Sequence, residues 1–226
     1  MSDHTRILLV RHAQPTSDAR GRCYGALDIG LSARGRAQAQ LLACTLEQVP
    51  LAAVYTSPSR RAVDSAAPAA RAHALTPIID ERLRELDFGD FEGRTYGEIE
   101  RSNPELYRQW MDTPTRVQFP GGESYTQLRA RALAAIDAIR ARHLGETAAV
   151  VSHGGVLRTI LADCLSMPAD AIFRLDQRHG AISIIDWIDA TPLVRLLNVP
   201  PTILAGNQRG FISALGELPS VASVAP

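Results

Sequence analysis

Short runs of apolar residues alternate along the chain with longer segments of mixed polarity. Every residue is apolar in the runs 7–10, 52–55 and 148–151, which have the length of a strand. Such runs are typical of strands that are buried on both faces of a parallel sheet. The short segment 78–80, of two isoleucines and an aspartate, predicts one more strand.

Helices are predicted between these runs from composition and from residues that start or stop a helix. Ser32 is a suitable N-cap for the first helix, Pro50 ends it, and Pro58 opens the second. Pro104 interrupts the third helix, and the segment 88–97 before it is predicted to be a loop. The predicted helices span 33–49, 58–73, 98–111, 123–143 and 155–165.

The alternation of strands with helices predicts an α/β fold, with three layers (α/β/α) and a mostly parallel central sheet. Two later apolar runs, 182–188 and 193–199, predict a hairpin at one edge of that sheet. No linker divides the range 1–199, which is therefore taken as one domain. The tail 200–226 is nearly uncharged and rich in Pro, Gly, Ala and Ser, so a packed arm and a disordered segment are alternatives.

Charge and cysteine content narrow the class of protein. Lys plus Arg and Asp plus Glu both total 24, so no excess of positive charge favours nucleic acid or an anionic membrane as a partner. The three cysteines are scattered without metal-binding spacing, which indicates free thiols in a reducing compartment. Because no long apolar segment is present, we expect a cytoplasmic enzyme. The oligomeric state stays open, with a homodimer as one alternative.

Candidate chemistry lies at the ends of the predicted strands. Arg11 and His12 directly follow the first long apolar run, and His153 comes after the third. Open α/β sheets bind their ligands beyond the carboxyl ends of parallel strands. Together with Arg61 and Glu85, these residues predict an anion pocket of phosphate size that contains a nucleophile and a proton donor.

Each residue type suits one part of a phosphoryl transfer that needs no metal. A neutral imidazole such as that of His12 is a good nucleophile and forms a phosphohistidine that water can hydrolyse. Arg11 and Arg61 offer planar forks for phosphate oxygens, and a protonated Glu85 can give the leaving alkoxide its proton. Taken singly, each residue has an ordinary structural explanation, such as a hydrogen-bonded strand end, a solvated arginine or a helix cap. Their combination favours the chemistry.

Four ordered motifs carry a resemblance to a known family. Residues 11–14 read R-H-A-Q where the family has R-H-G-E, and 57–62 fit S-x-L-x-R-A apart from a serine in place of the leucine. Residues 83–89 fit L-x-E-x-x-F-G, and 152–155 read S-H-G-G. On these motifs the chain resembles the histidine phosphatase superfamily, in its phosphoglycerate mutase-like branch. The stretches 21–25 and 120–124 are similar to those of α-ribazole phosphatases and broad-specificity phosphatases.

The resemblance implies a role for each residue of the site. His12 is the expected nucleophile, Glu85 the expected proton donor, and Arg11, Arg61 and His153 the expected phosphate ligands. The second motif selects Arg61 as the functional one of its two arginines. No metal and no other cofactor is implied. Three further residues are expected at the substrate: Tyr24, Gly25 and Gly154.

Ala13 and Asp18 depart from the family pattern, and His179 lies in a sequence that imitates one of its motifs. Ala13 replaces the usual glycine, which adds a methyl group and narrows the allowed backbone conformations. Asp18 stands where many relatives carry an asparagine, and its carboxylate would repel a phosphate dianion unless it turns away or pairs with Arg20 or Arg22. His179 belongs to a second R-H-G sequence that precedes an apolar run instead of following one. We expect this histidine at the rim of the substrate site, without a catalytic role.

The predicted function is hydrolysis of a small phosphorylated metabolite. Phosphoglycerate mutases of this family carry a longer insertion with paired arginines that hold the substrate carboxylate, whereas this chain has only Arg116 near that place. Without this hold on the dephosphorylated intermediate, water is expected to take the phosphoryl group. The alternatives are a mutase-type phosphoryl transfer and a weakly active binder of phosphorylated ligands. The sequence does not identify the physiological ester, because loops build the leaving-group pocket.

Overall fold

Strand β1 (His4–Arg11) is buried on both faces, because consecutive side chains of a strand point to opposite sides of the sheet. Ile7 and Leu9 pack into one hydrophobic core, and Leu8 and Val10 pack into the other. The uninterrupted apolar run of this strand therefore requires a layer of helices on each side.

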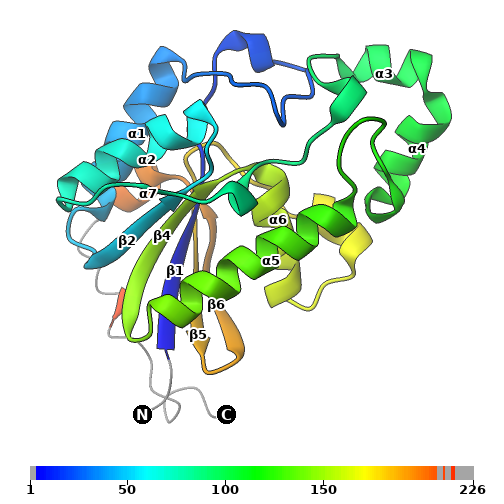
Figure 1. Ribbon diagram of the computed structural model, residues 1–226. Helices are drawn as coiled ribbons and strands as arrows, with labels where there is room; N and C mark the ends of the chain where they lie inside the picture. Colours follow the sequence, from blue (N-terminus) through cyan, green and yellow to red (C-terminus); the bar gives the residue numbers. More distant parts are fainter. Residues whose placement is uncertain (1–3, 208–210, 212–214, 217–226) are drawn as a thin grey trace.

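The structure is a computed structural model and describes residues 4–207, 211 and 215–216. Besides β1, the strands are β2 (Leu51–Thr56), β3 (Ile78–Ile79), β4 (Glu146–Ser152), β5 (Ile182–Ile188) and β6 (Thr191–Val199). They form a six-stranded sheet in the order β3-β2-β4-β1-β5-β6 (Figure 1). The pairs β3-β2, β2-β4 and β4-β1 are parallel, whereas β5 is antiparallel to β1 and forms a hairpin with β6.

Helices cover both faces of this sheet, which confirms the predicted three-layer α/β/α fold with its edge hairpin (Figure 1). Helices α1, α2 and α7 lie on one face and α5 and α6 on the other, while α3 and α4 stand beyond the carboxyl ends of the strands. Their bounds are Ala33–Leu46 (α1), Arg60–Ala72 (α2), Tyr96–Ser102 (α3), Pro104–Asp112 (α4), Tyr125–Arg142 (α5), Gly154–Cys164 (α6) and Pro201–Ala205 (α7). Among the described helices, none is long and apolar enough to cross a membrane.

Capping residues move two helix starts away from their predicted positions. Thr95 and Glu98 form a capping box, so α3 begins before the predicted start at 98. Ser124 and Gln127 form another, so α5 begins after the predicted start at 123. The predicted break at Pro104 is present, because a proline keeps the residue before it out of the helical conformation.

The described part of the C-terminal tail packs against the helical layer of α1 and α2. Helix α7 contacts α1, and Leu204 and Phe211 are buried in the same core as these helices. This part of the segment 200–226 is a packed arm. Positions 208–210, 212–214 and 217–226 lie outside the described residues.

Candidate active site

Three neighbouring strands of the sheet end side by side, and each is followed by a polar residue. After β1, the backbone N–H of His12 donates to the carbonyl of Ser152 over 2.8 Å. After β2, the N–H of Ser57 donates to the carbonyl of Val151 over 3.1 Å. His153 follows β4, which lies between these two strands. The parallel register thus brings two histidines together at the edge where such folds bind ligands.

The imidazole of His12 is buried, with 1% of the residue exposed. Its Nδ1 lies 2.8 Å from the carbonyl oxygen of Ala13, which can only accept a hydrogen bond. The hydrogen is therefore assigned to Nδ1, and Nε2 carries the free lone pair. Burial lowers the pKa of His12 well below 6.5, and the charges of His153, Arg11 and Arg61 act in the same direction. These effects favour the neutral form of the His12 imidazole.

His153 lies beside His12, with the two ring centroids 5.1 Å apart. Its Nε2 is 2.8 Å from the hydroxyl of Ser57, while its buried Nδ1 has no hydrogen-bond partner among the described residues. Burial lowers the pKa of His153, and so do the charges of Arg61 and Arg11. A buried polar nitrogen without a partner costs about 1–3 kcal/mol, which a bound oxygen ligand would recover.

Of the two arginines at the start of α2, one is buried and the other is exposed. Arg61 is completely buried, and its guanidinium donates to the carbonyls of Leu27, Tyr24 and Gly25 over 2.7, 3.0 and 2.8 Å. Its Nε has no partner within the described structure. Arg60 is exposed and lies near its helix neighbour, the Asp64 carboxylate, at 3.6 Å. Only Arg61 faces the histidines, because adjacent helix positions differ by about 100° around the axis.

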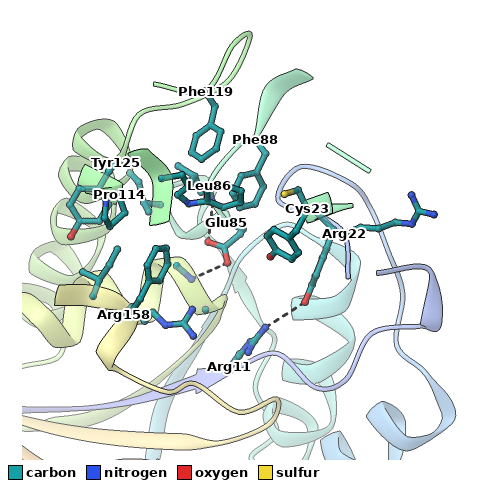
Figure 2. Close-up of a pocket in the computed structure, with 18 residues that line it drawn as sticks. Arg11, Arg22, Cys23, Glu85, Leu86, Phe88, Pro114, Phe119, Tyr125 and Arg158 are labelled. Atoms are coloured by element: carbon teal, nitrogen blue, oxygen red, sulfur yellow. Dashed lines mark hydrogen bonds between the residues drawn. The ribbon is translucent and has the colours of Figure 1, made fainter. Parts of the chain in front are cut away.

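Arg11 brings a second guanidinium to the site from the end of β1. Its Nη1 donates to the carbonyl of Gln177, and its Nη2 lies 3.5 Å from the hydroxyl of Tyr24 (Figure 2). The buried Nε has no partner among the described residues. Neither Arg11 nor Arg61 forms an ion pair with a described carboxylate. Two guanidinium groups without a direct ion-pair partner among the described carboxylates favour an anionic ligand.

Glu85 reaches the site from the loop after β3, and the start of α6 fixes its carboxylate. Oε1 accepts the N–H of Leu86 over 2.9 Å, and Oε2 accepts the N–H of Gly155 over 3.0 Å. A side chain on Gly155 would place its Cβ only 2.5 Å from Oε1, so glycine is required for this approach. The guanidinium of Arg131 holds the loop by donating to the carbonyl of Glu85 over 2.9 Å.

A cavity of about 170 Å³ opens beside the Glu85 carboxylate, which points into it (Figure 2). Arg11, Gly154 and Arg158 also line it. Its walls are otherwise largely aromatic, formed by Phe88, Tyr96, Trp110, Phe119, Tyr125 and Phe173. A group bonded to a phosphoryl oxygen next to Glu85 would enter this cavity, which makes it the candidate leaving-group pocket.

Tyr24 and Gly25 act in the site mainly through their backbone. Their carbonyls accept the hydrogen bonds of Arg61, and the guanidinium carbon of that arginine lies 5.2 Å from the centre of the Tyr24 ring. The carboxylate of Glu92 holds this loop by accepting the N–H groups of Gly25 and Ala26 over 3.0 and 2.8 Å. Gly25 lies so close to Leu86 that a Cβ would meet its carbonyl oxygen at 1.7 Å.

The two departures from the family pattern do not disturb the anion site. The methyl group of Ala13 is buried with Leu31 and Ala39, and its backbone does not adopt the left-handed conformation. The side chain of Asp18 is exposed and accepts a hydrogen bond from the hydroxyl of Thr16 over 3.0 Å. Asp18 therefore points away from the anion site and does not repel a phosphate there.

His179 lies beside His12, closer than the rim position that the sequence predicts. Its ring centroid is 5.3 Å from that of His12, and its Nε2 is buried without a partner among the described residues. The loop is held there because the N–H of Gly180 donates to the carbonyls of Arg11 and His12 over 3.0 and 3.2 Å. Burial, with the charge of Arg11, lowers the pKa of His179 to about 4.

The chain matches a group of known proteins along most of its length. The model of the histidine phosphatase superfamily (branch 1) matches residues 7–200. Phosphoserine phosphatase 1 of Hydrogenobacter thermophilus is 32% identical over 194 residues, covering 86% of this chain and 92% of that protein. The metal-independent phosphoserine phosphatase of Arabidopsis thaliana is 37% identical over 163 residues, covering 70% of this chain and 68% of that protein.

A solved structure is also similar to this chain in sequence and in fold. The α-ribazole phosphatase of Shigella flexneri superposes with a TM-score of 0.77 at 28% identity, covering 86% of this chain and 96% of that one. The family match spans the sheet and all four motifs of the site. The chain belongs to the histidine phosphatase superfamily, branch 1.

Proposed function

We propose that the chain hydrolyses a small phosphomonoester without a metal, through a phosphohistidine intermediate on His12. The observation that carries this proposal is the buried imidazole of His12 beside His153, with two guanidinium groups, Arg11 and Arg61, that form no ion pair with a described carboxylate. These groups supply a nucleophile and the positive charge that a phosphoryl transition state needs. The names of the phosphatase relatives support the same reaction class.

The reaction has two steps. First, Nε2 of His12 attacks phosphorus, the ester P–O bond breaks, and the leaving alkoxide takes the proton of Glu85. Arg11, Arg61 and His153 bind the oxygens of the transferred group in both steps. Then water attacks the phosphohistidine while Glu85 takes its proton, the P–N bond breaks, and inorganic phosphate leaves. The active form of His12 is regenerated.

A panel of phosphate esters tests the proposed reaction. We expect inorganic phosphate and the free alcohol to appear in equal amounts. A mutase would instead give an isomerised phosphate ester without phosphate release, and a mere binder would give neither. Either of these outcomes across the panel would overturn the proposal.

Removal of divalent metals should leave activity unchanged. The reason is that the arginines already provide positive charge at the phosphoryl group, and the described residues contain no group of three His, Cys, Asp or Glu side chains suited to a metal ion. The assay is phosphate release after thorough EDTA treatment. Activity that disappears and returns with Mg²⁺ would contradict the prediction.

Glu85→Gln should slow alkyl phosphate hydrolysis by ~100-fold or more, the loss typical of a missing general acid. An alkoxide leaves only with a proton, whereas p-nitrophenolate is stable without one, so p-nitrophenyl phosphate should lose distinctly less. Both substrates are compared while phosphorylation of His12 limits the rate. Glu81→Gln, on an exposed carboxylate of the same loop, is the matched control. Equal losses on both substrates would remove the general-acid role from Glu85.

The kcat/KM should persist as the pH falls from 7.5 to 6, where an ordinary histidine becomes protonated. Protonation would occupy the lone pair of His12, but burial and the nearby arginines lower its pKa well below 6.5. The nucleophile is therefore lost only at lower pH. Alkyl and aryl esters are measured in parallel. If kcat/KM falls because the substrate phosphate becomes protonated, the midpoint pH of that fall differs between the two esters. A substrate-independent acid limb near 6.5 would contradict the prediction.

A further inference from the structure

Arg158 places an additional guanidinium in the candidate leaving-group pocket. It lies on α6, one turn after Gly154, and lines the cavity beside Glu85. Figure 2 shows its guanidinium at the pocket, on the side of Arg11. Its Nε donates to the carbonyl of Leu175 over 2.7 Å, which fixes the orientation of the group. The two terminal nitrogens of the fork are thereby left for a ligand.

The charge of Arg158 is only partly offset by the described protein. It forms no ion pair with a described carboxylate. Burial lowers the pKa of Arg158 and the neighbouring charge of Arg11 lowers it further, although the carboxylates of Glu85 and Asp176 act in the opposite direction. Two guanidinium groups that repel each other in a half-buried place are stabilised when an anion binds there.

The phosphoryl group alone does not account for this charge. The phosphoryl group has its own ligands, because Arg11, Arg61 and His153 already surround His12 and can bind the phosphoryl oxygens. Arg158 lines the same pocket as Arg11, together with Ile172 and the aromatic walls, where the leaving group lies. Arg22 also lines the pocket, but its guanidinium donates to the carbonyl of Gly93 over 2.7 Å and points away (Figure 2).

We propose that Arg158 binds a second anionic group, a carboxylate or a phosphate, on the leaving group of the substrate. The inference rests on the proposed phosphatase function and adds the substrate class to it. A cavity of about 170 Å³ lies below the range of drug-sized sites, so the leaving group is small. The preferred substrates are thus small phosphate esters that carry a further anion.

Three aryl phosphates with the same ring test this inference: phenyl phosphate, 3-carboxyphenyl phosphate and 3-phosphonophenyl phosphate. The wild-type enzyme should have a higher kcat/KM for one or both anionic esters than for phenyl phosphate. Comparison of the carboxylate ester with the phosphonate ester shows which anion fits. Arg158→Met should lower kcat/KM for the preferred ester by about 10- to 100-fold, the range for a lost charge-assisted hydrogen bond. The kcat/KM for phenyl phosphate should change little in Arg158→Met. Arg158→Lys should keep part of the preference for the anionic ester.

Arg101→Met, at an exposed arginine of α3 that does not line the pocket, is the control, and its ratio of kcat/KM between the esters should equal that of the wild type. An equal loss on all three esters in Arg158→Met would mean that Arg158 binds the transferred phosphate or only holds the fold, and the inference would fail. Absence of a preference in the wild type would also overturn it.

Binding measurements separate this inference from the proposed function. Calorimetry compares benzylphosphonate with its 3-carboxy and 3-phosphono analogues on the wild type and on Arg158→Met. An anion-dependent affinity that is lost in the variant supports the role of Arg158 even if no ester is hydrolysed. Equal affinities for the three ligands would contradict it whatever the catalytic result.

Discussion

His12→Ala is expected to lower phosphate release by roughly 10⁴- to 10⁶-fold, the range found when a covalent nucleophile is removed. The nearest described imidazoles, His153 and His179, are centred 5.1 and 5.3 Å from the His12 ring, so neither of them takes its place. The folded structure should persist, since the side chain of His12 makes only one described hydrogen bond, to Ala13.

The measurement is phosphate release from the best substrate, with circular dichroism to verify the fold. His73→Ala is the matched control, because this histidine caps the far end of α2 and bonds to the carbonyl of Leu46 over 3.1 Å, outside the site. The control should keep the wild-type rate. A folded His12→Ala enzyme that turns over near the wild-type rate would refute the nucleophile assignment.

Arg61→Ala should reduce kcat/KM by roughly 10³-fold or more, as expected when an arginine that stabilises a phosphoryl transition state is lost. Its buried guanidinium also holds the carbonyls of Leu27, Tyr24 and Gly25, so the loop beside the nucleophile loses its anchor. Arg60→Ala should have little effect, because an exposed helix pair such as Arg60–Asp64 contributes about 0.3–0.5 kcal/mol.

The two variants are compared under identical conditions, and Arg61→Lys is added to separate charge from geometry. Lysine keeps the charge but cannot supply the planar fork, so Arg61→Lys should remain well below the wild type. Thermal unfolding of each variant distinguishes lost activity from lost fold. Equal losses in Arg60→Ala and Arg61→Ala would contradict the inward orientation of Arg61.

The sequence predicts the layers and the main site because both depend on short-range patterns. Uninterrupted apolar runs identify β1 and β4 as buried strands, and parallel strands place His12 and His153 at one edge. Helix ends are predicted less well where side-chain caps decide them, as the capping boxes of α3 and α5 show.

The rest of the site depends on contacts between distant segments that no local pattern reveals. His179 reaches the nucleophile because β5 pairs antiparallel with β1, which places the preceding loop against Arg11. Glu92, which lies outside the four motifs, supports the loop whose carbonyls accept the hydrogen bonds of Arg61. Arg158 reads in the sequence as an ordinary helix arginine, and only the fold shows that it lines the pocket.

The phosphohistidine is the central element of the account, and rapid quenching during the first turnover tests it most directly. The enzyme is mixed with p-nitrophenyl phosphate, quenched in alkaline denaturant to preserve phosphohistidine, and digested for mass spectrometry. The account predicts one phosphoryl group on the peptide that contains His12, and none on that peptide in His12→Ala. A burst of p-nitrophenol with an unmodified His12 peptide, or with the phosphoryl group on another residue, would contradict it.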